Sequence, residues 1–442
     1  MTVFAIDLND RTLSVCCRGH VLTGSLRLDP KALSTRHWSE LARLSSPSGR
    51  ALELITTDLS ARLRDHPPPA GARVWAAAPA MFESTALGLV LGAIRTLTPI
   101  DGFVDAAVAS AAALGLDRPA LAIELGLHHV AVTQLDFAGQ IRRRRVANSE
   151  RGGLLDLYRQ WLRLLAEIFV KRTRFDPLHD AAVEQRLFDL LPGLIAEATR
   201  SGSATAVLDS RGRRLEVPIS RDQLAEAARP FYRQMLSLLH SLRPAGAPIA
   251  LLMPQALVEL PGWRPLLGEF SGCELILLGD GFAGCALSVL DLPPTAPATQ
   301  AVPLLRRLPA QRHDCAVLCA DRELIERDTQ RSQPTHILVG AHTFVLGRHA
   351  LVVGRALAEA DSIGLPDGLA GVSRRHCTFM RERDAVVLID HSRCGTFVNE
   401  ERVTERVRVH AGDRVRLGEP GIELALITVD ALPGASHAPP AN

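Results

Sequence analysis

The sequence predicts an α/β region with two similar halves, followed by an all-β sandwich. A strand–turn–strand pattern opens the chain, with Val3–Leu8 and Thr12–Cys17 as its strands, and it returns about a hundred residues later. A proline-rich stretch, Asp291–Pro309, then indicates a linker. Beyond about Thr335 the apolar residues fall in short β-runs with turn signals between them and no helical period. This spacing is typical of a β-sandwich.

The two halves are predicted from a recurrence of strands and helices. Ala120–Glu124 and His129–Asp136 form the second strand pair around a turn at Gly126–His128. Between the two pairs lie a predicted strand at Arg73–Ala78 and an alanine-rich stretch, about Phe82 to Leu114, that we expect to be helical. Repeated sheet-then-helix units of this kind indicate two related α/β halves.

Further elements follow before the linker. Apolar residues at helical spacing predict helices at Gly153–Val170 and about Arg221–Leu242, and Ile249–Met253 and Glu274–Leu278 have the pattern of buried strands. Between the two helices, a turn near Gly212 predicts an exposed β-hairpin. The expected domains are residues 1–290, a linker and lead-in segment at 291–334, the sandwich at 335–430 and a flexible tail at 431–442.

Composition limits the classes of function. The 442 residues carry a formal net charge of +2, which argues against strong electrostatic binding to nucleic acid or anionic membrane. Lysine occurs only at Lys31 and Lys171, an arginine bias typical of a GC-rich bacterial genome. The first residues lack the pattern of a secretory signal, and no window offers about 20 uncharged apolar residues. We therefore expect a cytoplasmic bacterial protein without membrane insertion. Its oligomeric state does not follow from the sequence.

Two smaller patterns have competing explanations. The eight cysteines are scattered, which fits reduced thiols. His313, Cys315 and Cys319 have a loose metal-like spacing, but no second ligand pair lies near them in the sequence, so we expect no metal site. The run Arg142–Arg145 could be a nucleic-acid patch. The near-neutral net charge and the lack of interleaved aromatic residues favour a solvated hairpin edge.

Four short motifs stand in order in the C-terminal region: Gly354-Arg355, Ser373-Arg374-Arg375-His376, Asp390–Asn399 and Gly412–Gly418. Together they resemble the forkhead-associated (FHA) family over about 95 residues, because that family has GR, SRxH, DxSxNGTxVN and GDxxxLG in the same order. The resemblance implies a β-sandwich whose loops at one end bind phosphothreonine peptides. It also implies a Thr-phosphorylated protein as the partner.

By this resemblance, Arg355, Ser373 and Arg374 would bind the phosphate, and Arg393 would line the same mouth. The chemistry is suitable, since a guanidinium offers paired donors to a dianionic phosphate and a hydroxyl completes the shell. The arginines could instead be solvated surface charges on a structural sandwich. That alternative would not explain the spacing of Ser373 and His376.

The remaining motif residues are expected to support the loops or contact the peptide. His376 would hold the loops together from within, and Asn399 would help fix the backbone of the binding loop, as part of the peptide site. Gly354, Gly395 and Thr396 would be structural. Cys394 stands where the family usually has the Asn that grips the ligand backbone. A thiol is a weak donor and acceptor, so we expect a change in peptide specificity more than in phosphate binding.

Short segments of the first 290 residues match a second pattern. They are Val3–Leu8, Ala77–Ala80, Asp101–Gly115, Ala122–Gly126 and Leu277–Gly281. In order and spacing they resemble the actin, sugar-kinase and heat-shock-chaperone ATPase superfamily, with Asp101–Gly115 as the connecting helix. The resemblance implies an actin-like α/β fold and a nucleotide site. Its candidate residues are Asp7, Asn9, Thr12, Glu124, Gly126, Gly279 and Gly281.

The phosphate-binding turns depart from that superfamily. In active members both hairpin turns are rich in Gly and Thr or Ser, so that backbone N–H groups wrap the phosphates. Here the first turn reads Asn9-Asp10-Arg11, and Asp10 would place a like charge near the phosphates. The second turn, Gly126-Leu127-His128, keeps one glycine, and Glu124 stands where the family has Asp. Asp7 alone is retained as a magnesium or water-positioning carboxylate.

These predictions combine into a phosphothreonine-dependent adaptor with a pseudo-ATPase scaffold. We expect no catalytic residues and no required cofactor. The alternative is a nucleotide-dependent, chaperone-like ATPase that uses ATP and magnesium and is localised or regulated by its FHA domain. A third hypothesis is a structural sandwich that makes protein contacts without phosphate.

Overall fold

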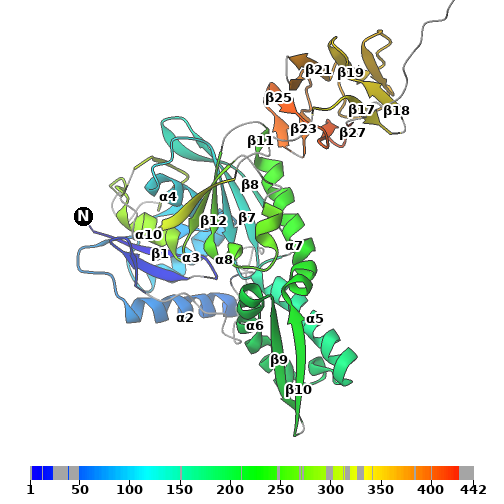
Figure 1. Cartoon of the computed structure of the whole chain (residues 1–442). Helices are drawn as coiled ribbons and strands as arrows, with labels where there is room; N and C mark the ends of the chain where they lie inside the picture. Colours follow the sequence, from blue (N-terminus) through cyan, green and yellow to red (C-terminus); the bar gives the residue numbers. More distant parts are fainter. Residues whose placement is uncertain are drawn as a thin grey trace, which may run out of the picture. The chain divides into compact units, whose positions relative to one another are not determined.

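The computed structural model describes residues 2–11, 13–22, 38, 49–149, 152–210, 212–245, 249–267, 270, 273–294, 302–311, 313, 319–325, 333–340, 342–382, 385–399 and 401–427. The chain divides into two compact units (Figure 1). The first comprises Met1–Leu242 and Pro248–Glu326, and the second comprises Arg243–Ala247 and Arg327–Asn442.

Two mixed sheets form the first unit and repeat the same strand order. One has the order β14-β5-β4-β1-β2-β3, and the other β15-β8-β7-β6-β12-β13-β16. In each, the leading strand (β1 or β6) pairs antiparallel with the next strand and parallel with a later one (β4 or β12). The expected recurrence is therefore present as topology. The bounds are β1 Val3–Asp7, β2 Ser14–Cys17, β3 His20–Val21, β4 Arg73–Ala78, β5 Gly102–Asp105, β6 Ala120–Leu125, β7 Val130–Phe137, β8 Gln140–Ser149, β12 Ile249–Pro254, β13 Cys273–Leu278, β14 Leu304–Leu305, β15 Arg307–Pro309 and β16 Cys319–Ile325.

Two short helices fill the space between the sheets. Every residue of α4 (Ala106–Ala113) is buried, and α4 packs with α10 (Phe282–Val289) and residues of both sheets in one core (Figure 1). The small alanine side chains let α4 approach both sheets closely. A second core covers the other face of the first sheet with α2 (Gly49–Asp65) and α3 (Ser84–Arg95).

The alanine-rich stretch is not one helix. It divides into α3, the strand β5 and α4, so the predicted single helix is wrong and Asp101–Gly115 is a strand followed by a helix. Pro99 follows α3 and cannot donate a helical hydrogen bond. A Cβ at Gly102 would lie 2.3 Å from the Trp75 ring, so only glycine lets β5 pair beside β4.

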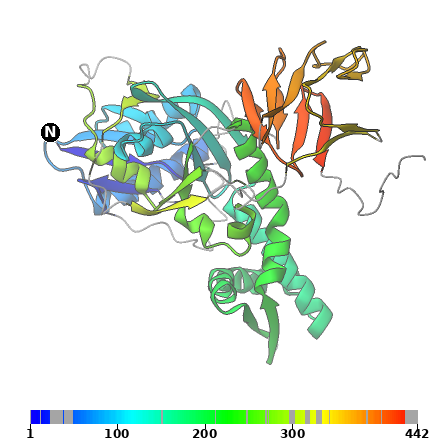
Figure 2. The same ribbon diagram turned by 45° about the horizontal axis from the view of Figure 1, so that its top comes forward.

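A helical insertion follows β8, the last of the three consecutive antiparallel strands β6, β7 and β8. It contains α5 (Leu154–Thr173), the 3₁₀ turn η2 (Pro177–His179), α6 (Ala181–Ser201) and α7 (Arg221–Leu242), with the hairpin β9 (Ser203–Ser210) and β10 (Arg213–Ser220) before α7 (Figure 2). The predicted helices at α5 and α7 are confirmed, as is the hairpin turn, where Gly212 has φ +72°. We did not anticipate α6. Two short helices, α8 (Gln255–Val258) and α9 (Trp263–Leu267), complete the unit.

The segment expected to be a linker contributes strands to the first unit. β14 pairs with β5, β15 pairs with β8, and β16 pairs with β13. Apolar residues supply part of these strands, and Leu308 of β15 is buried against the core. Edge strands also tolerate proline better than central strands do.

The second unit is an all-β sandwich, as predicted. Its two sheets have the orders β11-β24-β23-β26-β27-β17-β18 and β20-β19-β21-β22-β25. Their inner faces share one apolar core, which includes Ile337, Phe379 and Leu388. The bounds are β11 Pro244–Ala245, β17 His336–Val339, β18 His342–Val345, β19 Leu351–Arg355, β20 Ser362–Leu365, β21 Cys377–Glu382, β22 Ala385–Asp390, β23 Thr396–Val398, β24 Glu401–Val403, β25 Arg406–Val409, β26 Arg414–Leu417 and β27 Ile422–Ile427. The predicted tail, 431–442, lies outside the described residues.

Across the described residues, no helix is both long and apolar enough to span a membrane. The same residues contain no group of three or more His, Cys, Asp or Glu side chains arranged to hold a metal ion. Cys315, which belongs to the loose metal-like pattern, lies outside them.

Candidate functional site

His376 connects two loops at one end of the sandwich. Its Nδ1 accepts a hydrogen bond from the Ser373 backbone N–H at 3.0 Å, so the ring proton lies on Nε2, which donates to the Gly395 carbonyl at 3.2 Å. Burial lowers the pKa of His376, and the neutral ring that these two bonds require is therefore favoured. The structure thus gives His376 the loop-joining position that the motif implies.

Gly354 is needed because another loop approaches it closely. A Cβ on Gly354 would lie 1.9 Å from the carbonyl oxygen of Arg374. With glycine at this position, the backbone N–H of Arg355 donates to the Ser373 carbonyl at 3.1 Å. The Gly-Arg and Ser-Arg-Arg-His motifs are therefore joined directly, and Arg355 lies beside Ser373.

The Arg355 side chain is held but retains an unused donor. Its Nη1 donates to the Asp367 carbonyl at 2.9 Å and lies 3.9 Å from the Asp367 carboxylate. Its Nε is buried and has no hydrogen-bond partner within the described part of the chain. The guanidinium is thus positioned by one loop, and its buried Nε–H has no acceptor among the described residues.

The third motif places its loop against the same serine. The Arg393 backbone N–H donates to Ser373 Oγ at 3.3 Å, and the side chains of Arg374, Arg393 and Cys394 are exposed. The structure therefore brings the predicted residues Arg355, Ser373, Arg374, Arg393 and Cys394 to one loop cluster. Such a cluster of donors on a rigid sandwich can accept a phosphate.

Thr396 and Gly395 fix the conformation of the loop that carries Cys394. Buried Thr396 donates through Oγ1 to Asp390 at 2.7 Å, and Asp390 also accepts the Ser392 N–H at 3.0 Å. Gly395 has φ +86°, a conformation that favours glycine. Both residues have the structural role that was expected for them.

Arg402 is a functional candidate that the sequence did not reveal. A Cβ on Gly395 would lie 3.0 Å from Arg402 Nε, so this exposed guanidinium lies against the loop that carries Cys394. The contact arises from the register of β23 with β24, in which Phe397 pairs with Arg402. Only knowledge of that turn and its register could have identified it.

Asn399 does not support the binding loop. It follows β23, whereas Gly395 precedes that strand. Its side chain donates to Asp413 and accepts the Arg414 N–H, each at 2.9 Å. With φ +49° at Asn399, these bonds fix the turn before β26. The role assigned from the motif is therefore corrected to a structural one at the opposite end of β23.

In the first unit, the protein's own carboxylate occupies the second hairpin turn. Asp10, 4% exposed, accepts the backbone N–H of Leu127 at 2.7 Å and that of His128 at 3.3 Å. A Cβ on Gly126 would lie 2.5 Å from Asp10 Oδ1. These backbone donors of the second hairpin turn are therefore already bonded to Asp10.

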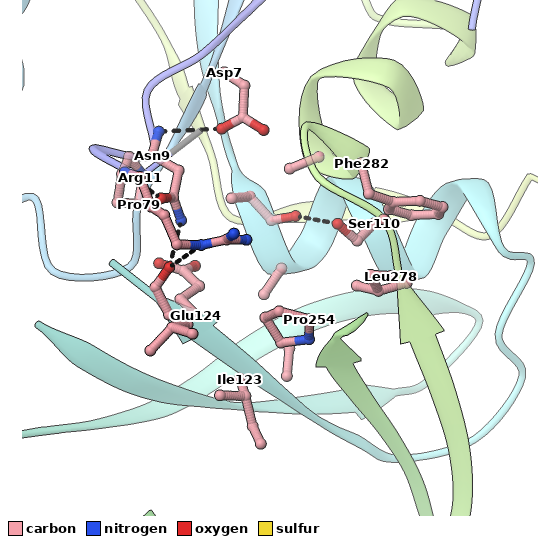
Figure 3. A pocket seen from close by; sticks show the side chains of 16 residues that line it. Asp7, Asn9, Arg11, Pro79, Ser110, Ile123, Glu124, Pro254, Leu278 and Phe282 are labelled. Atoms are coloured by element: carbon pink, nitrogen blue, oxygen red, sulfur yellow. Dashed lines mark hydrogen bonds between the residues drawn. The ribbon is translucent and has the colours of Figure 1, made fainter. Parts of the chain in front are cut away.

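The neighbouring side chains of the first turn also bond across to the second sheet. Asn9 Nδ2 and Arg11 Nε donate to the Leu125 carbonyl at 3.5 and 3.3 Å (Figure 3). Arg11 also pairs with Asp280 at 2.6 Å. The first turn thus bonds the first sheet to the second sheet.

The carboxylates behind these turns are deeply buried. Burial raises the pKa of Asp7 to about 6 and that of Glu124 to about 8. Asp7 accepts the N–H groups of Asn9 and Gly284, while Glu124 accepts the Ala80 N–H at 2.9 Å. Their backbone partners give both carboxyls a structural role.

The remaining candidates are dispersed around a small cavity. Gly279 lines it. Asp7, Asn9 and Glu124 line it too (Figure 3). Gly281 is the N-cap of α10 and has φ +75°. Thr12 lies outside the described residues. The cavity has a volume of about 70 Å³, whereas small-molecule sites usually enclose about 300–1,000 Å³. The residues present do not fit ATP in this arrangement.

Comparison with known proteins bears on the second unit. No curated protein matches the chain. Residues 331–418 match the family model of the FHA domain, a range that contains all four motifs. The C-terminal part of this chain is an FHA domain.

Proposed function

We propose that the protein is an adaptor that binds a partner phosphorylated on threonine. The observation that carries the proposal is Arg355, whose guanidinium is held beside Ser373 with its buried Nε unpartnered among the described residues. A phosphate would accept from Arg355 and from Ser373 Oγ. Arg374 and Arg393 would add charge at the exposed mouth, and Cys394 would face the peptide backbone.

Fluorescence anisotropy with phosphothreonine peptide libraries tests this function on the full chain. We expect micromolar binding that unphosphorylated peptides lack. Arg355→Ala should weaken it about 100-fold, or about 2.7 kcal/mol, while Arg408→Ala, an exposed arginine within β25, should have little effect. Equal binding with and without phosphate would instead support a sandwich that makes phosphate-independent contacts.

We further propose that the first unit is a pseudo-ATPase scaffold. The support is Asp10, whose carboxylate takes the place that a phosphate would need, and the bonds from Asn9 and Arg11 that fasten the halves together. Such a unit would present a fixed surface to a second partner.

Thermal unfolding with magnesium and ATP separates the scaffold from the ATPase alternative. A ligand at about 100 times its Kd adds roughly 2.7 kcal/mol to the free energy of unfolding. We expect no shift of the melting temperature at millimolar nucleotide. A rise of several degrees, absent with magnesium alone, would favour a nucleotide-dependent ATPase regulated by its FHA domain.

A further inference from the structure

A basic depression in the first unit lies apart from both sites described above. It is lined by Ser84 at the start of α3, by Arg142 and Arg143 of β8, and by the segment Leu304–Arg307. Its volume is about 510 Å³, within the range of about 300–1,000 Å³ that is usual for small-molecule sites.

The pairing of β15 with β8 brings two arginines of the depression together. Arg307 of β15 and Arg142 of β8 are direct cross-strand partners, and the next pair, Leu308 with Ile141, is buried on the opposite face. The two cationic side chains therefore share the outer face. Like charges directly opposite each other destabilise a sheet, and an anion bound between them would remove that cost.

The charge in the depression is incompletely balanced. Arg143 pairs with Asp105 at 2.8 Å, and Arg142 lies 3.7 Å from Asp136. The exposed Arg306 and Arg307 have no carboxylate within ion-pair distance among the residues with assigned positions. None of the described residues that line the depression is acidic.

The start of α3 adds to the positive potential. Ser84 is the first residue of this 12-residue helix, and the side chain of the preceding residue, Glu83, makes no capping hydrogen bond. A helix N-terminus carries a partial positive charge and free N–H groups. The exposed carboxylate of Glu83 offsets part of this charge, so the arginines supply most of the attraction for an anion at this edge.

We propose that this arginine depression binds a small organic anion that carries two or more phosphate groups. Two unpaired guanidinium groups can each bond a phosphate with paired donors, and Leu304 and Leu305 offer apolar contact to the organic part. Nucleic acid is the less favoured ligand, because the net charge of the chain is only +2 and no aromatic side chain lines the depression for base stacking.

Calorimetric titration of the full chain with inorganic triphosphate tests the proposal. The Arg355→Ala background removes the FHA phosphate site, so failure of one site is distinguishable from failure of the other. We expect saturable binding that the double variant Arg306→Glu/Arg307→Glu weakens by about tenfold or more. Arg145→Glu, an exposed arginine of the same strand outside the lining, should change it less than about twofold.

A second double variant and a folding check keep the result unambiguous. Arg306→Gln/Arg307→Gln repeats the loss without reversed charge, and thermal unfolding checks that each variant is folded. Absence of saturable binding, or equal weakening by Arg145→Glu and the double variant, would overturn the proposal. Tighter binding of a single-stranded oligonucleotide with the same dependence on Arg306 and Arg307 would overturn it in favour of nucleic acid.

Discussion

At the scale of single residues, Asp367 both holds and opposes the phosphate site. Its carbonyl positions Arg355, while its carboxylate lies 3.9 Å from the same guanidinium and is 82% exposed. The backbone bond survives substitution of the side chain, but the negative charge competes with an incoming phosphate. We therefore expect Asp367 to lower affinity at the proposed phosphate site, which its carbonyl also organises.

Asp367→Asn should strengthen phosphopeptide binding. An exposed ion pair contributes about 0.2–1 kcal/mol, so we expect affinity to rise up to about fivefold at low salt and the gain to shrink at high salt. Anisotropy titrations at two salt concentrations measure this. The control is Glu382→Gln, which removes a carboxylate paired with Arg406 away from the loops. Weaker binding by Asp367→Asn would show that its carboxylate supports the site.

Glu124 should make the first unit less stable as pH rises. Its pKa is raised from 4.5 unfolded to about 8 folded because burial disfavours the charge. The folded state therefore binds more protons than the unfolded state between these values, and stability falls as pH rises through this window. Glu124→Gln should remove this loss, with a gain that is small at pH 5 and on the order of a few kcal/mol at pH 8.

Denaturant unfolding at both pH values measures that gain. Glu167→Gln, which changes an exposed carboxylate of α5, should leave the pH dependence unaltered. If Glu124→Gln gave the same change at pH 5 and pH 8, burial of a proton-bearing carboxyl would not be the cause.

At the scale of elements, a close backbone contact between β19 and the loop before β21 fixes the geometry of the proposed phosphate site. Gly354→Ala would place a Cβ 1.9 Å from the Arg374 carbonyl, and neither backbone can move without displacing Ser373. Forced overpacking of this kind costs about 1–3 kcal/mol. We expect a lower melting temperature and a loss of phosphopeptide binding, measured by calorimetry and anisotropy.

A matched control is available for this substitution. Gly347→Ala meets no atom within 4 Å and needs no positive φ, so it should leave both properties nearly unchanged. Normal binding by Gly354→Ala would contradict the view that this contact aligns the loops.

What the sequence could predict at this scale depends on how local the signal is. The GR and SRxH motifs carry their information within a few residues, so Arg355, Ser373 and His376 were placed together correctly. Arg402 could not be found, since its contact with Gly395 depends on strand register. Asn399 was misplaced because a motif gives spacing along the chain and does not say to which end of β23 a residue belongs.

The predictions for two longer segments were wrong for a related reason. β5 was hidden in an alanine-rich stretch because the contact that requires Gly102 comes from Trp75 on a distant strand. The proline-rich segment was read as a linker because its pairing partners, β5 and β8, lie far away in the sequence. In both cases a tertiary contact outweighed local composition.

At the scale of the whole molecule, each unit can be understood by itself. The FHA domain retains an unpartnered donor at Arg355 among the described residues, whereas the hairpin-turn donors of the first unit are bonded to Asp10. The repeated strand order of the first unit is visible as a recurrence in the sequence. The hydrogen bonds from the second hairpin turn to Asp10 are not visible in the sequence, which predicts only that this carboxylate would repel phosphate.

The most direct test of the central claim follows the Arg355 Nε–H resonance by NMR in the full chain, assigned by comparison with Arg355→Lys. Adding a phosphothreonine peptide should shift this resonance strongly downfield, as an N–H without a partner acquires a phosphate acceptor. The unphosphorylated peptide should leave it in place. Phosphopeptide binding without any change at Arg355, or the same change with both peptides, would contradict the assignment of Arg355 as the phosphate-binding residue.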